Sequence, residues 1–258
     1  MSESSTGPNS GSPTRLCLLG RDHRLFLTVD VLATPRAAVA ICPGGLPDDA
    51  FYRHKGDRAY PNEDACCLVG DDDHVLLAVA DAHYGREASE RFIGAIAQES
   101  LPRSPVEFEA VLARLARLPA ADVGESETTL LVAWLDRRDL RVEAVSYGDS
   151  SLLHLRVEDR APQSPLSRGK RFVAPGELGF PEARASLRVA PGDLIALYTD
   201  GIDDAFGRDR GLTASDLDRI ARDCAHRPAD FVRAAIEAAL GELGDGGRDN
   251  LAVVAAAV

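Results

Sequence analysis

The chain has 258 residues and a formal net charge of −12, with 45% hydrophobic and 27% charged residues. At about 100 to 200 residues per domain, this length provides for one large or two small domains with enough apolar material for a core. The composition excludes intrinsic disorder over most of the chain. The negative charge argues against nonspecific binding to nucleic acid or an anionic membrane, and favours a cation as partner.

Residues 1–14 are rich in Ser, Gly, Pro and Thr and have no hydrophobic periodicity. We expect them to be disordered, ahead of a folded domain over residues 15–258. The chain does not open with a signal-peptide pattern, and no apolar run approaches the roughly 18 residues of a membrane span, so a cytoplasmic location is expected. The five cysteines are an odd number without C-x-x-C spacing, and we interpret them as reduced, buried thiols.

Apolar runs predict the first strands and helices. Short runs within residues 15–43 suit strands, and runs at 64–70 and 74–81 flank turn-forming aspartates and predict a hairpin. Helical periodicity follows at 87–101 and 105–118, joined by a short connection that makes these helices antiparallel neighbours.

The second half of the chain repeats this order. Strand patterns lie at 128–135, 140–148, 151–157, 185–190 and 193–200, helical patterns at 213–225 and 229–243, and a last strand at 251–258. This order lacks the one-for-one alternation of a doubly wound parallel sheet. Two antiparallel sheets packed face to face, with a helix pair outside each, use every element, so we expect an α+β fold, a four-layer αββα sandwich.

Carboxylates mark the ends of four predicted strands. Glu63 and Asp64 precede one strand, Asp81 and Asp200 follow two others, and Asp249 precedes the last. Strand ends gather at the edges of a sandwich, so these side chains can converge. Converging carboxylates need raised pKa values or a divalent cation, and oxygen donors alone favour Mg²⁺ or Mn²⁺ over Zn²⁺. The alternative is that each aspartate simply caps a turn or strand.

Six blocks of the sequence resemble, in order, those of the metal-dependent protein phosphatases, the PPM or protein phosphatase type 2C family, in its bacterial form. They lie within residues 57–258 and read PNEDACCLV, VLLAVADAHYGREAS, ETTLLVAWL, VSYGDSSLLHL, PGDLIALYTDGI and RDNLAVV. The resemblance implies an αββα sandwich with a binuclear Mn²⁺ or Mg²⁺ centre that hydrolyses phosphoserine and phosphothreonine in proteins. It also implies a phosphorylated protein partner and a serine/threonine kinase.

The resemblance also implies roles for individual residues. Asp81 would bridge both cations, and the backbone carbonyl of Ala82 would bind one of them. Asp200 and Asp249 would hold the second cation. Two further carboxylates would bind metal or orient its waters: Glu63 and Asp64.

His83 is the residue expected to protonate the departing serine or threonine oxygen, which suits an imidazole at neutral pH. Paired cations lower the pKa of a water and clamp the phosphoryl oxygens, so the reaction needs no protein nucleophile. The absence of a G-x-S-x-G elbow from the sequence agrees with this chemistry.

Several positions depart from the family pattern. Tyr84 replaces a glycine beside the metals and either narrows the site or offers a surface to substrate. Arg58 stands six rather than five residues before Asp64, and is either a phosphate ligand or a solvated charge; Arg53, His54 or Lys55 are its substitutes. Glu125 is the candidate ligand of a weaker third cation, assisted by Asp203 and Asp204 unless these simply face water.

Positive charge gathers in and before the stretch between Leu155 and Arg188, and forms either a solubilising loop or a docking surface for a phosphorylated or acidic partner. The residues are Arg156, Arg160, Arg168, Lys170 and Arg171.

Three functional hypotheses follow. The first is a Mn²⁺- or Mg²⁺-dependent protein serine/threonine phosphatase of bacterial type. The second is a catalytically weak or inactive pseudophosphatase that acts as a regulatory binding module, suggested by Tyr84, the shifted Arg58 and the missing arginine after Gly148-Asp149-Ser150. The third is a phosphatase that serves partner-switching regulators of sigma factors. The sequence leaves open the substrate, the oligomeric state and the role of residues 15–43.

Overall fold

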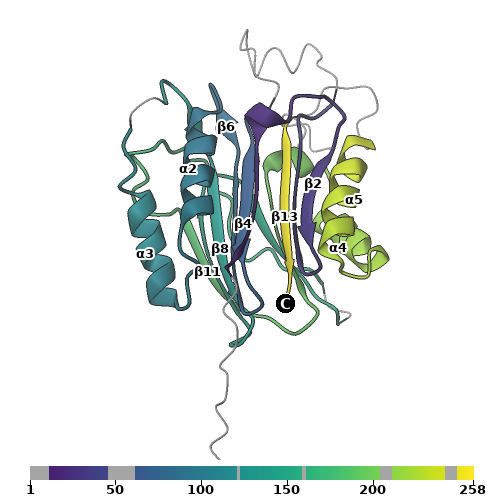
Figure 1. Cartoon of the computed structure of the whole chain (residues 1–258). Helices are drawn as coiled ribbons and strands as arrows, with labels where there is room; N and C mark the ends of the chain where they lie inside the picture. The colour runs from purple at the N-terminus through teal and green to yellow at the C-terminus, as the bar shows by residue number, and fades with distance from the viewer. Residues whose placement is uncertain (1–11, 46–61, 121–122, 159–160, 204–210, 242–248) are drawn as a thin grey trace, which may run out of the picture.

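Two antiparallel sheets lie face to face in the computed structural model of the chain, and helices cover the outer face of each (Figure 1). The structure describes residues 12–45, 62–120, 123–158, 161–203, 211–241 and 249–258. The four-layer αββα arrangement predicted from the order of elements is therefore confirmed.

The first sheet has six strands. In spatial order they are β1 (Thr14–Leu19), β4 (Ala65–Gly70), β5 (His74–Ala80), β8 (Leu130–Asp136), β9 (Arg141–Tyr147) and β11 (Ala183–Arg188). Alternate residues of β5 face opposite sides, since Val75, Leu77 and Val79 enter the core between the sheets while Leu76 and Ala78 pack towards the helices. Burial on both faces explains why these strands read as continuous apolar runs.

The second sheet has five strands, and a separate pair forms a short ribbon. In spatial order the five are β10 (Ser151–Leu155), β12 (Leu194–Tyr198), β13 (Leu251–Ala257), β3 (Ala37–Cys42) and β2 (Asp30–Thr34). The ribbon pairs β6 (Ala82–His83) with β7 (Glu127–Thr128). Single 3₁₀ turns, η1 (Gly20–Asp22) and η2 (Asp200–Ile202), follow β1 and β12.

One helix pair covers each sheet, as predicted. Helices α2 (Glu87–Gln98) and α3 (Pro105–Leu115) bury their apolar faces on the six-stranded sheet, and α4 (Ala214–Asp223) and α5 (Pro228–Gly241) on the five-stranded sheet. Ser104 caps α3 through the N–H of Glu107, and Thr213 with Asp216 forms a capping box on α4. These caps fix the helix starts close to their predicted positions.

The structure differs from the sequence-based prediction at two points within the first 43 residues. Of the strand-like runs within residues 15–43, LFLTVDVL (residues 25–32) enters a strand only at Asp30, where β2 begins. Leu27 has a φ of 63°, which no strand accommodates, and its N–H bonds to the carbonyl of Gly44. Of the expected disordered segment, residues 1–11 lie outside the described residues and Thr14 already belongs to β1, so the domain limits stay predictions.

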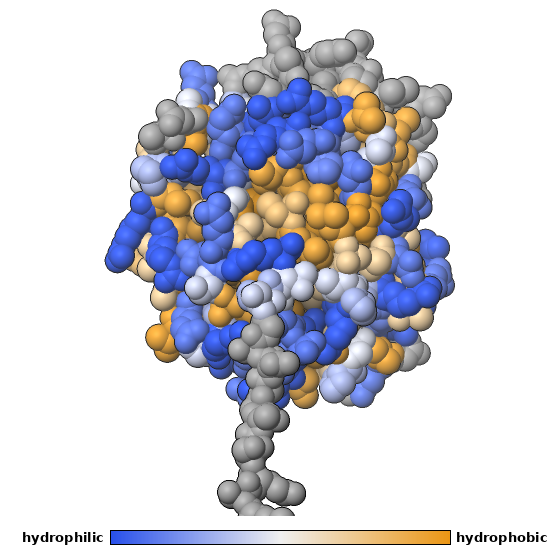
Figure 2. Space-filling model, viewed as in Figure 1, coloured by the Kyte–Doolittle hydropathy of each residue, from blue (hydrophilic) through white to orange (hydrophobic). Residues whose placement is uncertain are grey.

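The surface divides in a simple way on the side viewed in Figure 1. Figure 2 shows hydrophilic residues gathered at its upper part and an apolar band across its middle, between the two sheets. The upper end is the one where β6 lies (Figure 1). None of the helices in the described ranges combines the length and apolar character needed to cross a membrane.

Candidate metal centre

Three aspartates from separate parts of the chain meet at the end of the sandwich where β6 lies. Asp81 directly follows β5, Asp149 lies between β9 and β10, and Asp200 opens η2 after β12. One carboxylate oxygen from each lies within 4.8 Å of the others. The predicted convergence of strand-end carboxylates is thus observed for Asp81 and Asp200, and Asp149 joins them.

The electrostatics of this cluster are unfavourable without a cation. Burial, followed by the carboxylates of Asp81, Asp249 and Asp149, raises the pKa of Asp200 well above its ordinary range. The donors are oxygens only, and several lie within reach of one ion. Such a set fits Mg²⁺ or Mn²⁺, which prefer carboxylate ligands and neutralise their repulsion.

Asp64 is hydrogen-bonded to Thr199, the residue before Asp200. The hydroxyl of Thr199 donates to Oδ2 of Asp64 at 2.8 Å, and both residues are fully buried. The backbone N–H of Asp64 bonds to the side chain of Asn62 at 3.2 Å. The orientation of the Asp64 carboxylate is therefore set by its neighbours.

Glu63 and Asp249 are joined through Asn250. The side-chain oxygen of Asn250 accepts the backbone N–H of Glu63 at 2.8 Å. The backbone N–H of Asn250 donates to Oδ1 of Asp249, also at 2.8 Å. Glu63 Oε1 accepts the N–H of Gly85 at 2.8 Å, which fixes the turn after Asp81. These contacts place two more carboxylates at the same end of the sheets. Both residues are buried, with exposures of 1% for Glu63 and 9% for Asp249.

The backbone around Asp81 is equally well held. Its carbonyl accepts the hydroxyl of Thr128 at 2.9 Å and the N–H of Thr129 at 2.8 Å, and its N–H bonds to the Thr129 hydroxyl at 3.1 Å. The backbone N–H and carbonyl of Thr128 both bond to Val173. Although Thr128 lies opposite Ala82 in the β6–β7 ribbon, it therefore makes no backbone hydrogen bond to the Ala82 carbonyl. The role of that carbonyl as a cation ligand stays a prediction.

Gly201 allows η2 to approach the loop before β13. A Cβ atom at this position would lie 2.0 Å from the backbone oxygen of Asn250, closer than real Cβ contacts. The glycine that follows Asp200 is therefore a packing requirement of the site. It brings the Asp200 turn and the Asp249 loop together.

His83 lies on β6, two residues beyond Asp81. Its ring packs edge-on against Phe172, with centroids 4.4 Å apart, and lies 6.4 Å from the ring of Tyr84. Tyr84 itself is 57% exposed and has a φ of 60°. Both aromatic rings lie near the predicted acid, whose role stays a prediction.

Two candidates from the sequence have different outcomes. Arg58, with its substitutes Arg53, His54 and Lys55, lies outside the described residues. Glu125 is exposed and does not belong to the carboxylates within 4.8 Å, whereas Asp149 does, so the geometry places the extra carboxylate at Asp149. Asp203 pairs with Arg168, and Asp204 is outside the described ranges.

Asp149 is the residue that sequence reasoning missed. It follows the apolar strand β9 after only one residue, Gly148, in the same way that Asp81 and Asp200 follow β5 and β12. The rule that selected those two aspartates also selects this one.

Several basic residues of the predicted docking surface have internal partners. Arg168 bonds to the hydroxyl of Ser151 and to Asp203, and the Arg171 guanidinium bonds to the carbonyls of Glu177 and Phe180. These charges stabilise the loop before β11. Arg160 lies outside the described residues.

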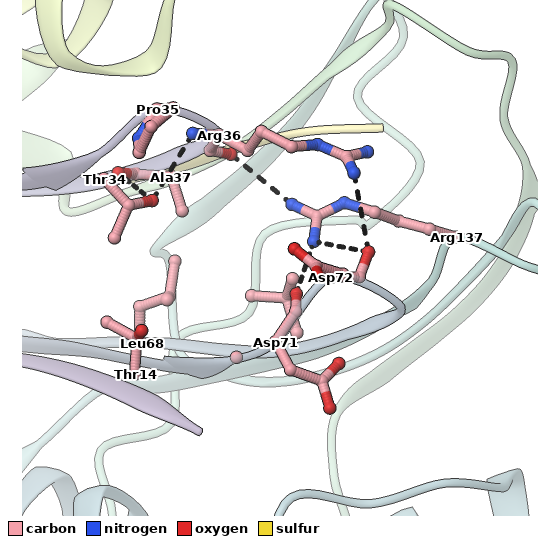
Figure 3. Close-up of a pocket in the computed structure, with 11 residues that line it drawn as sticks. Thr14, Thr34, Pro35, Arg36, Ala37, Leu68, Asp71, Asp72 and Arg137 are labelled. Carbon is pink, nitrogen blue, oxygen red and sulfur yellow. Dashed lines mark hydrogen bonds between the residues drawn. The ribbon is translucent and has the colours of Figure 1, made fainter. Parts of the chain in front are cut away.

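A hollow of about 300 Å³ lies at the opposite ends of β4 and β5 from the carboxylates (Figure 3). Arg137 crosses it and donates to the carbonyls of Asp71 and Ala257 at 2.8 Å each. Burial, followed by the nearby Arg36, lowers the pKa of Arg137 to about 10. Arg137 therefore connects the turn after β4 to the end of β13. The hollow has no part in the metal centre.

A family model described as Stage II sporulation protein E (SpoIIE) matches residues 71–258, more than half of the chain. The chain belongs to the SpoIIE family. This family is PP2C-like and of the PPM class, so the resemblance of the six sequence blocks is confirmed. No curated protein matches the sequence significantly.

Solved structures share the fold. The Mycobacterium tuberculosis serine/threonine phosphatase PstP/Ppp is 21% identical, with 89% of this chain and 99% of that chain covered and a TM-score of 0.62. The catalytic domain of PstP in complex with two manganese ions is 20% identical over 90% and 100% of the chains, also with a TM-score of 0.62. RsbX in complex with magnesium is 14% identical over 90% and 100%, with a TM-score of 0.57. Family and fold place this chain among the PPM-type protein serine/threonine phosphatases.

Proposed function

We propose that this SpoIIE-family chain is an active protein serine/threonine phosphatase that removes phosphate from phosphoserine and phosphothreonine by a water activated between two Mn²⁺ or Mg²⁺ ions. The observation that carries the proposal is the approach of the Asp81, Asp149 and Asp200 carboxylates to within 4.8 Å. The raised pKa of Asp200 supports it, because carboxylates in this arrangement repel one another until a cation neutralises them.

The cations would be held by the residues that the sequence singled out. Asp81, Asp200 and Asp249 would be ligands, together with the backbone carbonyl of Ala82. Glu63 and Asp64 are the outer carboxylates, kept in place by Asn250 and Thr199. When bound, the two ions activate a water and neutralise the phosphoryl oxygens.

The protein residues then bind and orient the phosphorylated substrate and protonate its leaving group. His83 is held by Phe172 next to the cluster, and we assign to it the protonation of the departing serine or threonine oxygen. The Thr128 and Thr129 bonds fix the Asp81 backbone, so the cluster is ordered before substrate arrives. The partner is a phosphorylated protein, the product of a serine/threonine kinase.

The test is phosphate release from phosphoserine and phosphothreonine peptides. We expect turnover with millimolar Mn²⁺, loss in EDTA and recovery when Mn²⁺ is added back. Asp81→Asn and Asp249→Asn should each lower turnover at least about a hundredfold, since each removes a metal ligand. Asp139→Asn, an exposed aspartate at the far end of the sheets, is the matched control and should retain full activity.

Turnover that persists in EDTA, or that both ligand variants retain, overturns the proposal. Binding of two Mn²⁺ ions by the wild-type chain without turnover also overturns it, and supports the regulatory binding module instead.

A further inference from the structure

An aromatic side chain stands in a strained conformation beside the metal centre. Tyr84 has a φ of 60°, a region that bulky residues adopt rarely and at a cost in free energy. The residue is 57% exposed, so the strain is not offset by burial. Strain of this kind concentrates at functional sites.

The turn that carries Tyr84 is held at both ends. Asp81 is bonded to Thr128 and Thr129, and the N–H of Gly85 bonds to Glu63 Oε1 at 2.8 Å while its carbonyl accepts the Ser126 hydroxyl at 2.5 Å. The backbone between these anchors has little freedom. The ring of Tyr84 is therefore presented outward from a rigid turn.

Phe172 provides a second ring next to His83. The next residue, Val173, exchanges backbone bonds of 2.9 and 2.8 Å with Thr128, the residue whose hydroxyl holds the Asp81 carbonyl. Phe172 contacts the His83 ring at a centroid distance of 4.4 Å. Both rings are thus fixed relative to the metal ligands and to His83.

The charged alternative for this surface is weaker. The Arg168 guanidinium donates hydrogen bonds to Ser151 and Asp203. The Arg171 guanidinium donates to backbone carbonyls. These two arginines are therefore engaged within the chain, whereas Tyr84 is exposed and Phe172 is half-buried beside His83.

We infer that Tyr84 and Phe172 form an aromatic wall that determines specificity, by packing against an apolar side chain next to the phosphorylated residue of a protein substrate. This inference rests on the proposed phosphatase function and names the substrate class: phosphoserine or phosphothreonine flanked by an aliphatic residue. A ring on one side of a bound aliphatic side chain shields part of that side chain from water. A substrate with the aliphatic residue should therefore have a kcat/KM about tenfold higher than one without it, which is at the low end of the range for apolar contacts.

The test compares two phosphoserine peptides that differ only in the flanking residues, leucine in one and glycine in the other. The wild-type enzyme should prefer the leucine peptide about tenfold in kcat/KM. Tyr84→Gly, which suits the positive φ, should reduce this preference to about twofold or less, whereas Tyr84→Phe should keep it. Because the ratio is taken within each variant, a general loss of activity cancels.

Phe180→Ala is the matched control. Phe180 is 90% exposed and lies on the loop that leads into β11, and we expect its removal to leave the preference unchanged. Phe172→Ala should lower the preference as Tyr84→Gly does. Equal use of the two peptides by the wild type, or an undiminished preference in both Tyr84→Gly and Phe172→Ala, overturns the aromatic wall while leaving the phosphatase proposal standing. A wild type that hydrolyses neither peptide overturns both.

Discussion

The hydroxyl of Thr199 donates a hydrogen bond of 2.8 Å to Oδ2 of Asp64, although the two residues are 135 positions apart. The same hydroxyl accepts the N–H of Ala252 at 2.9 Å, so one buried threonine joins the six-stranded sheet, β12 and β13. Thr199, which precedes the metal-ligand candidate Asp200, thus orients a second candidate, Asp64.

Thr199→Val should weaken both the fold and the cation site. The substitution keeps the shape but leaves a buried acceptor on Asp64 and a buried N–H on Ala252, at a cost of about 1–3 kcal/mol in the free energy of unfolding. Urea unfolding measures this loss, and calorimetry should show a Mn²⁺ affinity about tenfold lower. Thr199→Ser, which keeps the hydroxyl, is the control. Equal Mn²⁺ affinities for the Val and Ser variants would contradict this role.

Asp149→Asn should stabilise the metal-free protein. Neutralising one of the converging carboxylates removes repulsion on Asp200 and should raise the free energy of unfolding in EDTA by about 1 kcal/mol. The same variant should gain less stability from Mn²⁺ than the wild type does, because it binds the ion more weakly. Thermal unfolding in EDTA and in Mn²⁺ measures both effects. A variant less stable than the wild type in EDTA would show that Asp149 does not belong to the repelling cluster.

Gly201→Ala should disrupt the approach of η2 to the Asp249 loop. The added Cβ atom would lie 2.0 Å from the Asn250 oxygen, so backbone has to move, and we expect a loss of about 2–3 kcal/mol in unfolding free energy. Gly94→Ala is the control, since nothing lies within 4 Å of a Cβ there and its helix gains up to about 1 kcal/mol. Denaturant unfolding of the two variants should therefore give changes of opposite sign, and a stable Gly201→Ala protein would be evidence against the close approach.

The buried pair of His154 and Asp193 gives a pH-dependent prediction. Burial alone raises the pKa of Asp193, but hydrogen bonds from His154 Nε2 at 2.7 Å and from the N–H groups of Ala190 and Val157 bring it below its ordinary value of 3.8. A depressed pKa in the folded state stabilises the protein above the unfolded-state pKa, and this stabilisation is lost as the pH falls through the folded-state pKa.

Asp193→Asn should therefore cost about 1–3 kcal/mol in the free energy of unfolding at pH 7, with a difference that shrinks below pH 3.8. Urea unfolding of both proteins at pH 7 and at several values below pH 4 measures it. A difference that stays constant with pH would mean that the carboxylate charge contributes nothing.

Much of the fold was predictable because its local signals agree with its tertiary structure. The β4–β5 hairpin carries Asp71 in the turn, where its Oδ1 accepts the N–H groups of Asp73 and His74, and the apolar runs beside it are buried in the sandwich. Helices α3 and α4 begin at capping residues visible in the sequence. Periodicity, turn chemistry and caps all favour the same element limits.

The sequence did not predict features that depend on distant contacts. Strands β6 and β7 have two residues each and no periodicity, and they exist because Thr128 and Thr129 bond to Asp81. The internal use of Arg168 likewise depends on Asp203, which lies 35 positions away. The candidate site followed a local rule, aspartate at a strand end, which selected Asp81 and Asp200, two of the three aspartates that converge, and was not applied to Asp149.

The most direct measurement of the central claim is the anomalous scattering of Mn²⁺ in crystals of the wild-type chain and of Asp81→Asn. We predict two peaks in contact with Asp81 in the wild type, with Asp200 as a further ligand, and loss of both peaks in the variant. A wild-type map with no peak between Asp81 and Asp200, at a Mn²⁺ concentration that saturates turnover, would contradict the account.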